Sequence, residues 1–144
     1  MTVEGIGPLR AGMSLAEVRT VLDTTLTLPA VAENECAIAP LPGVADGLAL
    51  MLVRDTLARI DVFGSAPTAT VEGARIGDTR AQIEALYPGR VRAGPHKYTD
   101  GQYLVVPATP DTMRQLVFET DEQGKVTRYR AGRLPEVGWV EGCS

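Results

Sequence analysis

The stretch that decides the fold is Gly12–Val18, which reads GMSLAEV, and it returns in altered form at Gly77–Ile83 as GDTRAQI. In each copy a glycine stands two residues before Ser14 or Thr79, and a Glu or Gln stands three residues after that hydroxyl. This spacing is typical of a capping box, in which the hydroxyl accepts from a free backbone N–H and the later side chain accepts from the N–H of the cap residue. The two stretches therefore predict two helix starts of the same design.

Further matches follow both helix starts in the same order along the chain. Thr2–Gly5 (TVEG) returns as Thr70–Gly73, and each predicted helix is followed by three strand-like runs. Such ordered matches indicate an internal duplication. The predicted strands, bounded by turn residues, are 36–39, 48–53 and 57–62 in the first half and 103–106, 115–119 and 125–130 in the second.

The expected architecture follows from this repeated unit of one helix and three strands. An antiparallel meander has one apolar face, and amphipathic helices can cover it. We therefore predict an α+β fold in which two tandem helix-plus-three-strand repeats form one antiparallel sheet with helices packed on one face. Residues 1–144 are expected to form a single domain, with the first repeat at 1–66 and the second at 67–144.

A helix start of this kind, followed by a meander and then duplicated, resembles the β-lactamase-inhibitor-protein-like (BLIP-like) superfamily, which includes small bacterial outer-membrane assembly lipoproteins. The resemblance rests on Gly12–Val18 and Gly77–Ile83, and the duplicated topology extends it over most of the chain. It implies an exported, non-enzymatic binder, and the inhibitors in this superfamily use the open concave face of the sheet. This chain departs from the inhibitors because it has few aromatic residues, no disulfide within each repeat and no lipobox cysteine near its start. Inhibition of β-lactamase is therefore not carried over.

Composition restricts the possible classes of function. The 144 residues are 44% hydrophobic and carry a formal net charge of −4, which suits one folded domain. The net acidity and the absence of a basic stripe argue against nucleic-acid binding. His96 is the only histidine, and the sequence contains neither a phosphate loop nor a nucleophile elbow. We expect no metal, no cofactor, no catalytic residue and no transmembrane segment, since no apolar run approaches the ~20 residues that span a bilayer.

Cys36 and Cys143 are the only cysteines, and they are too far apart in sequence for a CxxC motif. They are either the ends of a long-range disulfide or two unrelated thiols. We predict the disulfide, which would tie down the C-terminal tail and place the protein in the periplasm or outside the cell. No signal peptide is visible in Met1–Gly5. Met1 either follows a removed leader or is the true start of a cytoplasmic protein, and the exported interpretation presumes a leader that is absent from this sequence.

Alternation along the last predicted strand of each half gives a candidate partner-binding surface. It places Arg59 and Asp61 on one face of the first strand, and Arg128 and Arg130 on the matching face of the second. If the apolar sides pack on the helices, these residues lie on the open face, where arginines can bind acidic groups of a partner. The alternative interpretation is a solvated face with cross-strand charge pairs.

Three other groups of residues have both a functional and a structural interpretation. His96, Tyr98 and Tyr103 are candidate partner or ligand contacts, or they belong to a solvated loop that turns at Asp100 and Gly101. Glu33 and Glu35 are a carboxylate pair for acid/base or cation chemistry, or an acidic loop. Trp139 is a partner anchor, or it packs the tail onto the sheet.

The sequence thus predicts a non-enzymatic exported bacterial envelope protein that binds a protein partner through an open β-sheet face. One alternative is a small-ligand binder or enzyme with a pocket around His96, Tyr98 and Tyr103. Another is a purely structural envelope module whose sheet packs against a larger assembly, which a broad exposed apolar patch would indicate.

Overall fold

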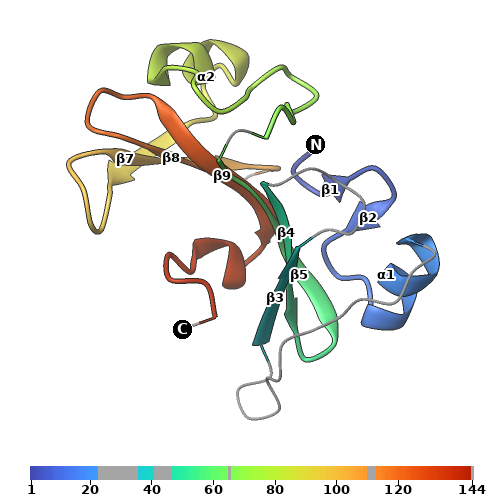
Figure 1. Ribbon diagram of the computed structural model, residues 1–144. Coiled ribbons are helices and arrows are strands. Elements are labelled where there is room, and N and C mark those ends of the chain that lie inside the picture. Colours follow the sequence, from blue (N-terminus) through green and yellow to red (C-terminus); the bar gives the residue numbers. More distant parts are fainter. Residues whose placement is uncertain (23–35, 41–46, 65, 110–112, 144) are drawn as a thin grey trace.

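The computed structural model describes residues 1–22, 36–40, 47–64, 66–109 and 113–143. Its main feature is a seven-stranded antiparallel sheet (Figure 1). A sheet of two short strands and two short α-helices accompany it. The elements are β1 (Gly5–Ile6), β2 (Leu9–Arg10), α1 (Leu15–Leu22), β3 (Cys36–Pro40), β4 (Leu48–Val53), β5 (Thr56–Val62), α2 (Arg80–Leu86), β6 (Arg92–Pro95), β7 (Gln102–Pro107), β8 (Arg114–Thr120), β9 (Val126–Arg133) and the 3₁₀-helix η1 (Glu136–Gly138).

The large sheet has the strand order β3-β4-β5-β9-β8-β7-β6. Strands from the two halves of the sequence meet at its centre, where β5 pairs with β9 and Asp61 lies opposite Arg130. The apolar face of the sheet forms the core. Its large side chains include Leu50, Ile60, Leu104, Leu116, Phe118 and Tyr129.

The fold is mostly β, so the expected α+β class with helices packed on one face of the sheet is wrong. α1 has eight residues and buries only Leu15 and Val18, while α2 has seven residues and buries only Ile83. A helix of about two turns presents too little apolar surface to form a layer over seven strands. The capping-box pattern marks where a helix begins, but it carries no information on how far the helix continues.

The two predicted helix starts are confirmed in detail. The Ser14 N–H donates to Glu17 Oε1 over 3.2 Å, and the Glu17 N–H donates to Ser14 Oγ over 3.1 Å. Thr79 and Gln82 form the same reciprocal pair, with distances of 2.7 and 3.2 Å. The glycine before each box is also held in a similar way, because the N–H of Gly12 donates to the carbonyl of Leu57 at the start of β5, and that of Gly77 to the carbonyl of Val126 at the start of β9.

Candidate functional site

The sheet face opposite the core carries most of the polar side chains singled out from the sequence. The middle of this face is covered by residues 134–143, which we call the C-terminal segment. Figure 1 shows η1 and the C-terminus on the side of β5 and β9 that faces away from α1. Apart from the single turn of η1, the segment has no regular secondary structure. Its first residue is attached by a backbone hydrogen bond from the Leu134 N–H to the Met113 carbonyl, and side chains of the sheet donate further hydrogen bonds to its carbonyls.

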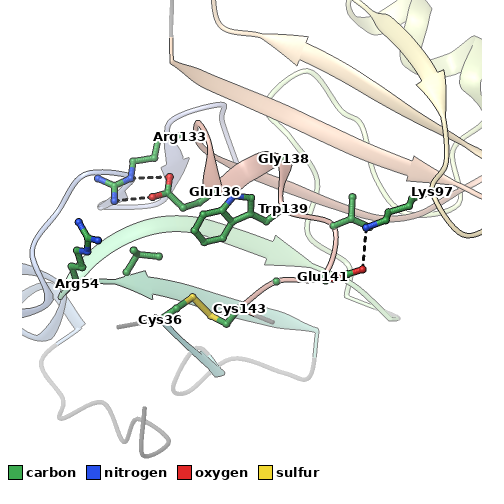
Figure 2. Close-up of a pocket in the computed structure, with 12 residues that line it drawn as sticks. Cys36, Arg54, Lys97, Arg133, Glu136, Gly138, Trp139, Glu141 and Cys143 are labelled. Carbon is green, nitrogen blue, oxygen red and sulfur yellow. Dashed lines mark hydrogen bonds and ion pairs between the residues drawn. A yellow bond between two sulfur atoms is a disulfide. The ribbon is translucent and has the colours of Figure 1, made fainter. Parts of the chain in front are cut away.

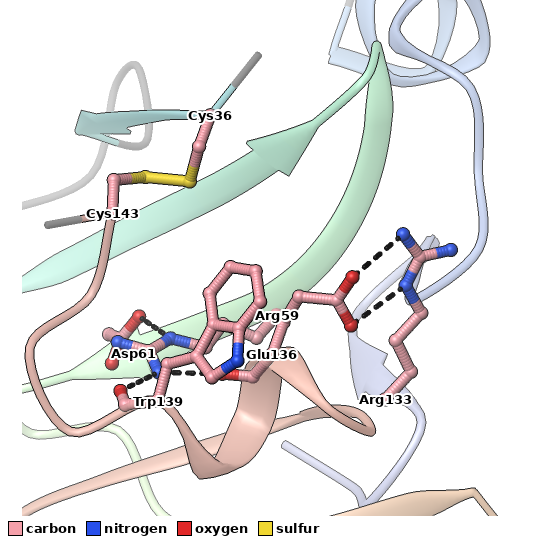
Figure 3. The surroundings of a disulfide bond; sticks show 7 residues. All are labelled: Cys36, Arg59, Asp61, Arg133, Glu136, Trp139 and Cys143. Carbon is pink, nitrogen blue, oxygen red and sulfur yellow. Dashed lines mark hydrogen bonds and ion pairs between the residues drawn. A yellow bond between two sulfur atoms is a disulfide. The ribbon is translucent and has the colours of Figure 1, made fainter. Parts of the chain in front are cut away.

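Arg59 on β5 is the first of these side chains (Figure 3). Its Nε donates to Asp61 Oδ2 over 2.9 Å, and one terminal nitrogen donates to the carbonyls of Glu136 and Trp139 over 2.9 and 2.7 Å. Arg59 and Asp61 are only 3% and 4% exposed. Burial lowers the pKa of Arg59 by more than the charge of Asp61 raises it. An arginine nevertheless stays protonated in a protein, so this pair presents a buried cation to main-chain carbonyls.

Arg130 on β9 forms a second pair next to the first. Its Nε donates to the carbonyl of Val137 over 2.5 Å, and a terminal nitrogen donates a hydrogen bond to Glu119 Oε2. The other oxygen of Glu119 lies 2.9 Å from His96 Nε2. Burial by itself raises the pKa of Glu119, but the hydrogen bond from His96 and the charge and hydrogen bond of Arg130 outweigh it, so the pKa is lowered. Glu119 is therefore an ionised carboxylate with both oxygens engaged.

His96 completes this second pair from the loop after β6. Its Nδ1 accepts the N–H of Tyr98 over 3.0 Å, so Nδ1 carries no proton and the ring proton lies on Nε2, toward Glu119. The ring stacks on Tyr103 with centroids 4.5 Å apart, and the His96 side chain is 9% exposed. The structure thus brings His96, Tyr98 and Tyr103 together, and both histidine nitrogens are used within the chain.

The predicted disulfide between Cys36 and Cys143 is confirmed, with Cα atoms 5.6 Å apart in two residues that are 107 positions apart in sequence. It fastens the end of the C-terminal segment to β3, an outer strand of the sheet (Figure 2). An ion pair of 3.1 Å between Lys97 and Glu141 adds a second, exposed attachment. The segment is therefore held at its end by a covalent bond and along its length by the two buried arginines.

Exposed apolar and aromatic side chains lie in and beside the segment. Ile38, Phe63, Tyr98 and Trp139 are 39%, 36%, 59% and 37% exposed. Two cations stack on this group, with Lys97 Nζ 5.3 Å from the Tyr98 ring centre and Arg128 Cζ 5.7 Å from that of Phe63. We call these six residues the aromatic rim.

Two hollows flank the C-terminal segment. The larger, of about 660 Å³, lies between the disulfide, Trp139, Arg54 and Arg133 (Figure 2). The smaller, of about 300 Å³, lies on the side of Phe63. A third hollow of about 600 Å³ lies beside His96 and Tyr98.

The structure corrects the expected open face at three of its four strand positions. Arg59, Asp61 and Arg130 are buried because the C-terminal segment covers them, and only Arg128 is exposed. The sequence interpretation also missed Glu119, although alternation with Val117 on the predicted strand 115–119 places both on the face of Arg130. Glu33 and Glu35 lie outside the described residues.

Two further observations concern only the residues that the structure describes. None of their helices is long and apolar enough to cross a membrane. They also contain no group of three or more His, Cys, Asp or Glu side chains that could hold a metal ion.

Comparisons of the chain with protein-family models, with curated proteins and with solved structures find no match.

Proposed function

We propose that this chain is an exported bacterial envelope protein without catalytic activity, and that it binds a protein partner through the sheet face bearing the C-terminal segment. The observation that carries the proposal is the aromatic rim. Among the described residues, seven large apolar side chains are exposed, and four of them lie in or beside this segment. Trp139 belongs to it, Ile38 and Phe63 line a hollow together with Val140 and Gly142, and Tyr98 adjoins Lys97, which pairs with Glu141. Exposed apolar side chains that gather on one face are a feature of interaction sites.

The chemistry of the rim suits protein recognition. Tyrosine, tryptophan and arginine contribute most to binding energy in protein interfaces, because they combine a large apolar surface with a polar group. Here Trp139 belongs to a backbone segment that the disulfide and two buried arginines hold in place, and Arg128 lies beside that segment. Tyr98 adjoins Lys97, which pairs with Glu141 of the segment. A surface fixed in advance loses little conformational entropy when it binds.

The proposed compartment rests on the disulfide. Disulfides persist in oxidising environments, so Cys36–Cys143 supports export to the periplasm or beyond the cell. The resemblance of Gly12–Val18 and Gly77–Ile83 to the helix starts of the BLIP-like superfamily supports the same interpretation, since members of that superfamily are exported binders.

The alternative function, a small-ligand pocket around His96, Tyr98 and Tyr103, is favoured by the hollow beside His96. Against it, the hydrogen bonds of His96 to Glu119 and to the backbone of Tyr98 occupy both ring nitrogens. A ligand in this hollow would find neither nitrogen of the His96 ring available for a hydrogen bond, so the protein-binding function is preferred.

The test is affinity capture from bacterial envelope extract with the immobilised chain. We expect a specific captured protein that is lost when Tyr98 and Trp139 are both replaced by alanine. The matched control is the double variant Val21→Ala with Val71→Ala, which removes two exposed apolar side chains outside the rim and should retain the capture. If no protein is captured specifically, or if the two double variants capture it equally, the proposal is wrong.

A further inference from the structure

The smaller hollow beside the C-terminal segment has features of a binding site for one particular kind of chemical group. Its volume of about 300 Å³ is at the lower end of the range of ligand pockets. Apolar side chains form much of its wall, namely Ile38, Ala49, Phe63 and Val140. Ala49 lies directly opposite Asp61 in the register of β4 and β5, so only a methyl group stands beside the carboxylate on this strand, and both residues line the hollow.

Asp61 brings an unused hydrogen-bond acceptor to this hollow. Its side chain is 5% exposed, and Oδ2 accepts from Arg59 Nε over 2.9 Å. The other oxygen, Oδ1, is buried and has no hydrogen-bond partner in the part of the chain that the structure describes. Figure 3 shows the carboxylate joined to Arg59 through only one of its oxygens. A buried acceptor without a donor costs free energy, and a bound donor would remove that cost.

The charges around the hollow indicate that this donor is neutral. Arg59 and Arg128 both line it, and two guanidinium groups disfavour an incoming ammonium or guanidinium group. Asp61 and Glu141 are also in its wall and disfavour an incoming carboxylate. Hydroxyl and amide groups are neutral donors that meet neither repulsion.

The walls indicate that the donor is attached to an aromatic ring. Arg128 lies over the Phe63 ring at 5.7 Å, so a second ring in the hollow can contact both the guanidinium group and the Phe63 side chain. A phenol combines such a ring with a neutral hydroxyl donor. Among protein side chains this is tyrosine, which is enriched among the residues that contribute most to interface energy.

We propose that this hollow binds a phenol, and that the protein partner fills it with a tyrosine whose hydroxyl donates to Asp61 Oδ1. The second part rests on the proposed function, because it names the residue by which the partner engages the same face. The first part concerns this chain alone.

The test of the first part is titration of the oxidised 144-residue chain with 4-methylphenol, followed by ¹H–¹⁵N NMR. We expect 4-methylphenol to shift the amide signals of residues around the hollow. It should bind about tenfold more tightly than 4-methylanisole, which has the same ring but no donor, because the hydroxyl reaches a charged acceptor. Benzylamine and 4-methylbenzoate, a cation and an anion of similar size, should bind more weakly than 4-methylphenol.

Two variants connect binding to the residues. Asp61→Asn keeps an oxygen for Arg59 but turns an amide N–H₂ toward the hollow, so the preference for 4-methylphenol over 4-methylanisole should fall to about one. Ala49→Leu fills the hollow and leaves Asp61 itself unchanged, so it should abolish binding of both compounds, and this result does not depend on the folding of Asp61→Asn. Glu122→Gln, an exposed change outside the hollow, is the matched control and should bind like the native chain.

Each outcome supports or overturns the inference. Absence of 4-methylphenol binding, equal binding of 4-methylanisole, or unchanged binding by Ala49→Leu would show that the hollow is not a phenol site. The role of a partner tyrosine is tested by capture with Ala49→Leu, which should retain less of the captured protein than Glu122→Gln does. If capture succeeds equally with both variants, the partner binds the rim without entering the hollow, and only the inference fails. If 4-methylphenol binds but no partner is captured, the proposed function fails and the hollow stands as a site for small phenols.

Discussion

Two buried arginine–carboxylate pairs lie side by side beneath the C-terminal segment, and they differ in how completely their hydrogen bonds are satisfied. In both pairs the arginine donates to main-chain carbonyls of the segment. Glu119 receives Arg130 on one oxygen and His96 on the other. Asp61 receives Arg59 on one oxygen only. The pair of Arg130 and Glu119 is thus complete within the chain, whereas the pair of Arg59 and Asp61 has capacity for one more donor.

The difference originates in the loops that reach each pair. The loop between β6 and β7 brings His96 over the end of β8, where it contacts Glu119. Beside Asp61, the described residues form a partly apolar hollow, and none of them donates a hydrogen bond to Oδ1. One half of the molecule therefore uses its buried carboxylate only for structure, while the other half has a carboxylate oxygen that a ligand can use.

Removal of the disulfide that fastens the C-terminal segment over both pairs should have the largest effect on stability. The double variant Cys36→Ser with Cys143→Ser opens a loop of 107 positions, and in the chain-entropy model this lowers the free energy of unfolding by about 4–5 kcal/mol. Chemical denaturation measures the change, and the native chain treated with a dithiol reductant should match the variant. Hydrogen exchange should quicken most at the Gly142 amide, which lies next to the cut. An unchanged denaturation midpoint would contradict the structural role of the bond.

Replacement of each carboxylate in turn tests the comparison between the pairs directly. Glu119→Ala leaves Arg130 buried beside no carboxylate and should lower the free energy of unfolding by about 3–4 kcal/mol. Asp61→Ala likewise leaves Arg59 buried beside no carboxylate, but it also removes an oxygen that is buried without a donor, so it should cost about 1–2 kcal/mol less than Glu119→Ala. Urea denaturation of both variants gives the values, with Glu122→Ala as an exposed control. Equal losses would mean that the unsatisfied oxygen of Asp61 has no energetic consequence.

Acid should weaken the complete pair in a predictable direction. The pKa of Glu119 is lower in the folded chain than the ordinary value of 4.5. Its contribution to stability is therefore fully present above about pH 4.5 and is lost as the pH falls through the lower folded-state pKa. Glu119→Gln cannot titrate, so its stability should fall less steeply with acid than that of the native chain. Denaturation curves between pH 7 and pH 2 make this comparison, and parallel pH profiles would count against it.

Much of the sheet could be predicted from the sequence because alternation is a local property. The predicted strands 48–53 and 103–106 match β4 and β7 within one residue at each end. Alternation also placed Arg59 and Arg130 correctly on the face away from the core. β6 was missed because its sequence RAGP contains glycine and proline and does not alternate.

The cover over that face could not be predicted in the same way. The C-terminal segment has no periodic pattern, and its position depends on a disulfide and on hydrogen bonds between residues more than 70 positions apart, such as Arg59 and Trp139. Nothing in the local sequence of β5 distinguishes a buried arginine from an exposed one. The cysteines were the available signal, since a bond from Cys143 back to Cys36 requires the tail to return to the sheet.

The smallest expected effect on stability comes from an ion pair at the edge of the same segment. Lys97 and Glu141 form a bridge of 3.1 Å, but their side chains are 57% and 47% exposed. Water screens such a pair, so Lys97→Ala should change the free energy of unfolding by less than about 0.5 kcal/mol. Urea denaturation followed by the fluorescence of Trp139, the only tryptophan, measures this change next to the segment itself. A loss as large as that of Glu119→Ala would mean that exposed attachments hold the segment as firmly as the buried arginines do. The energetic distinction between the buried Arg130–Glu119 pair and the exposed Lys97–Glu141 pair would then fail.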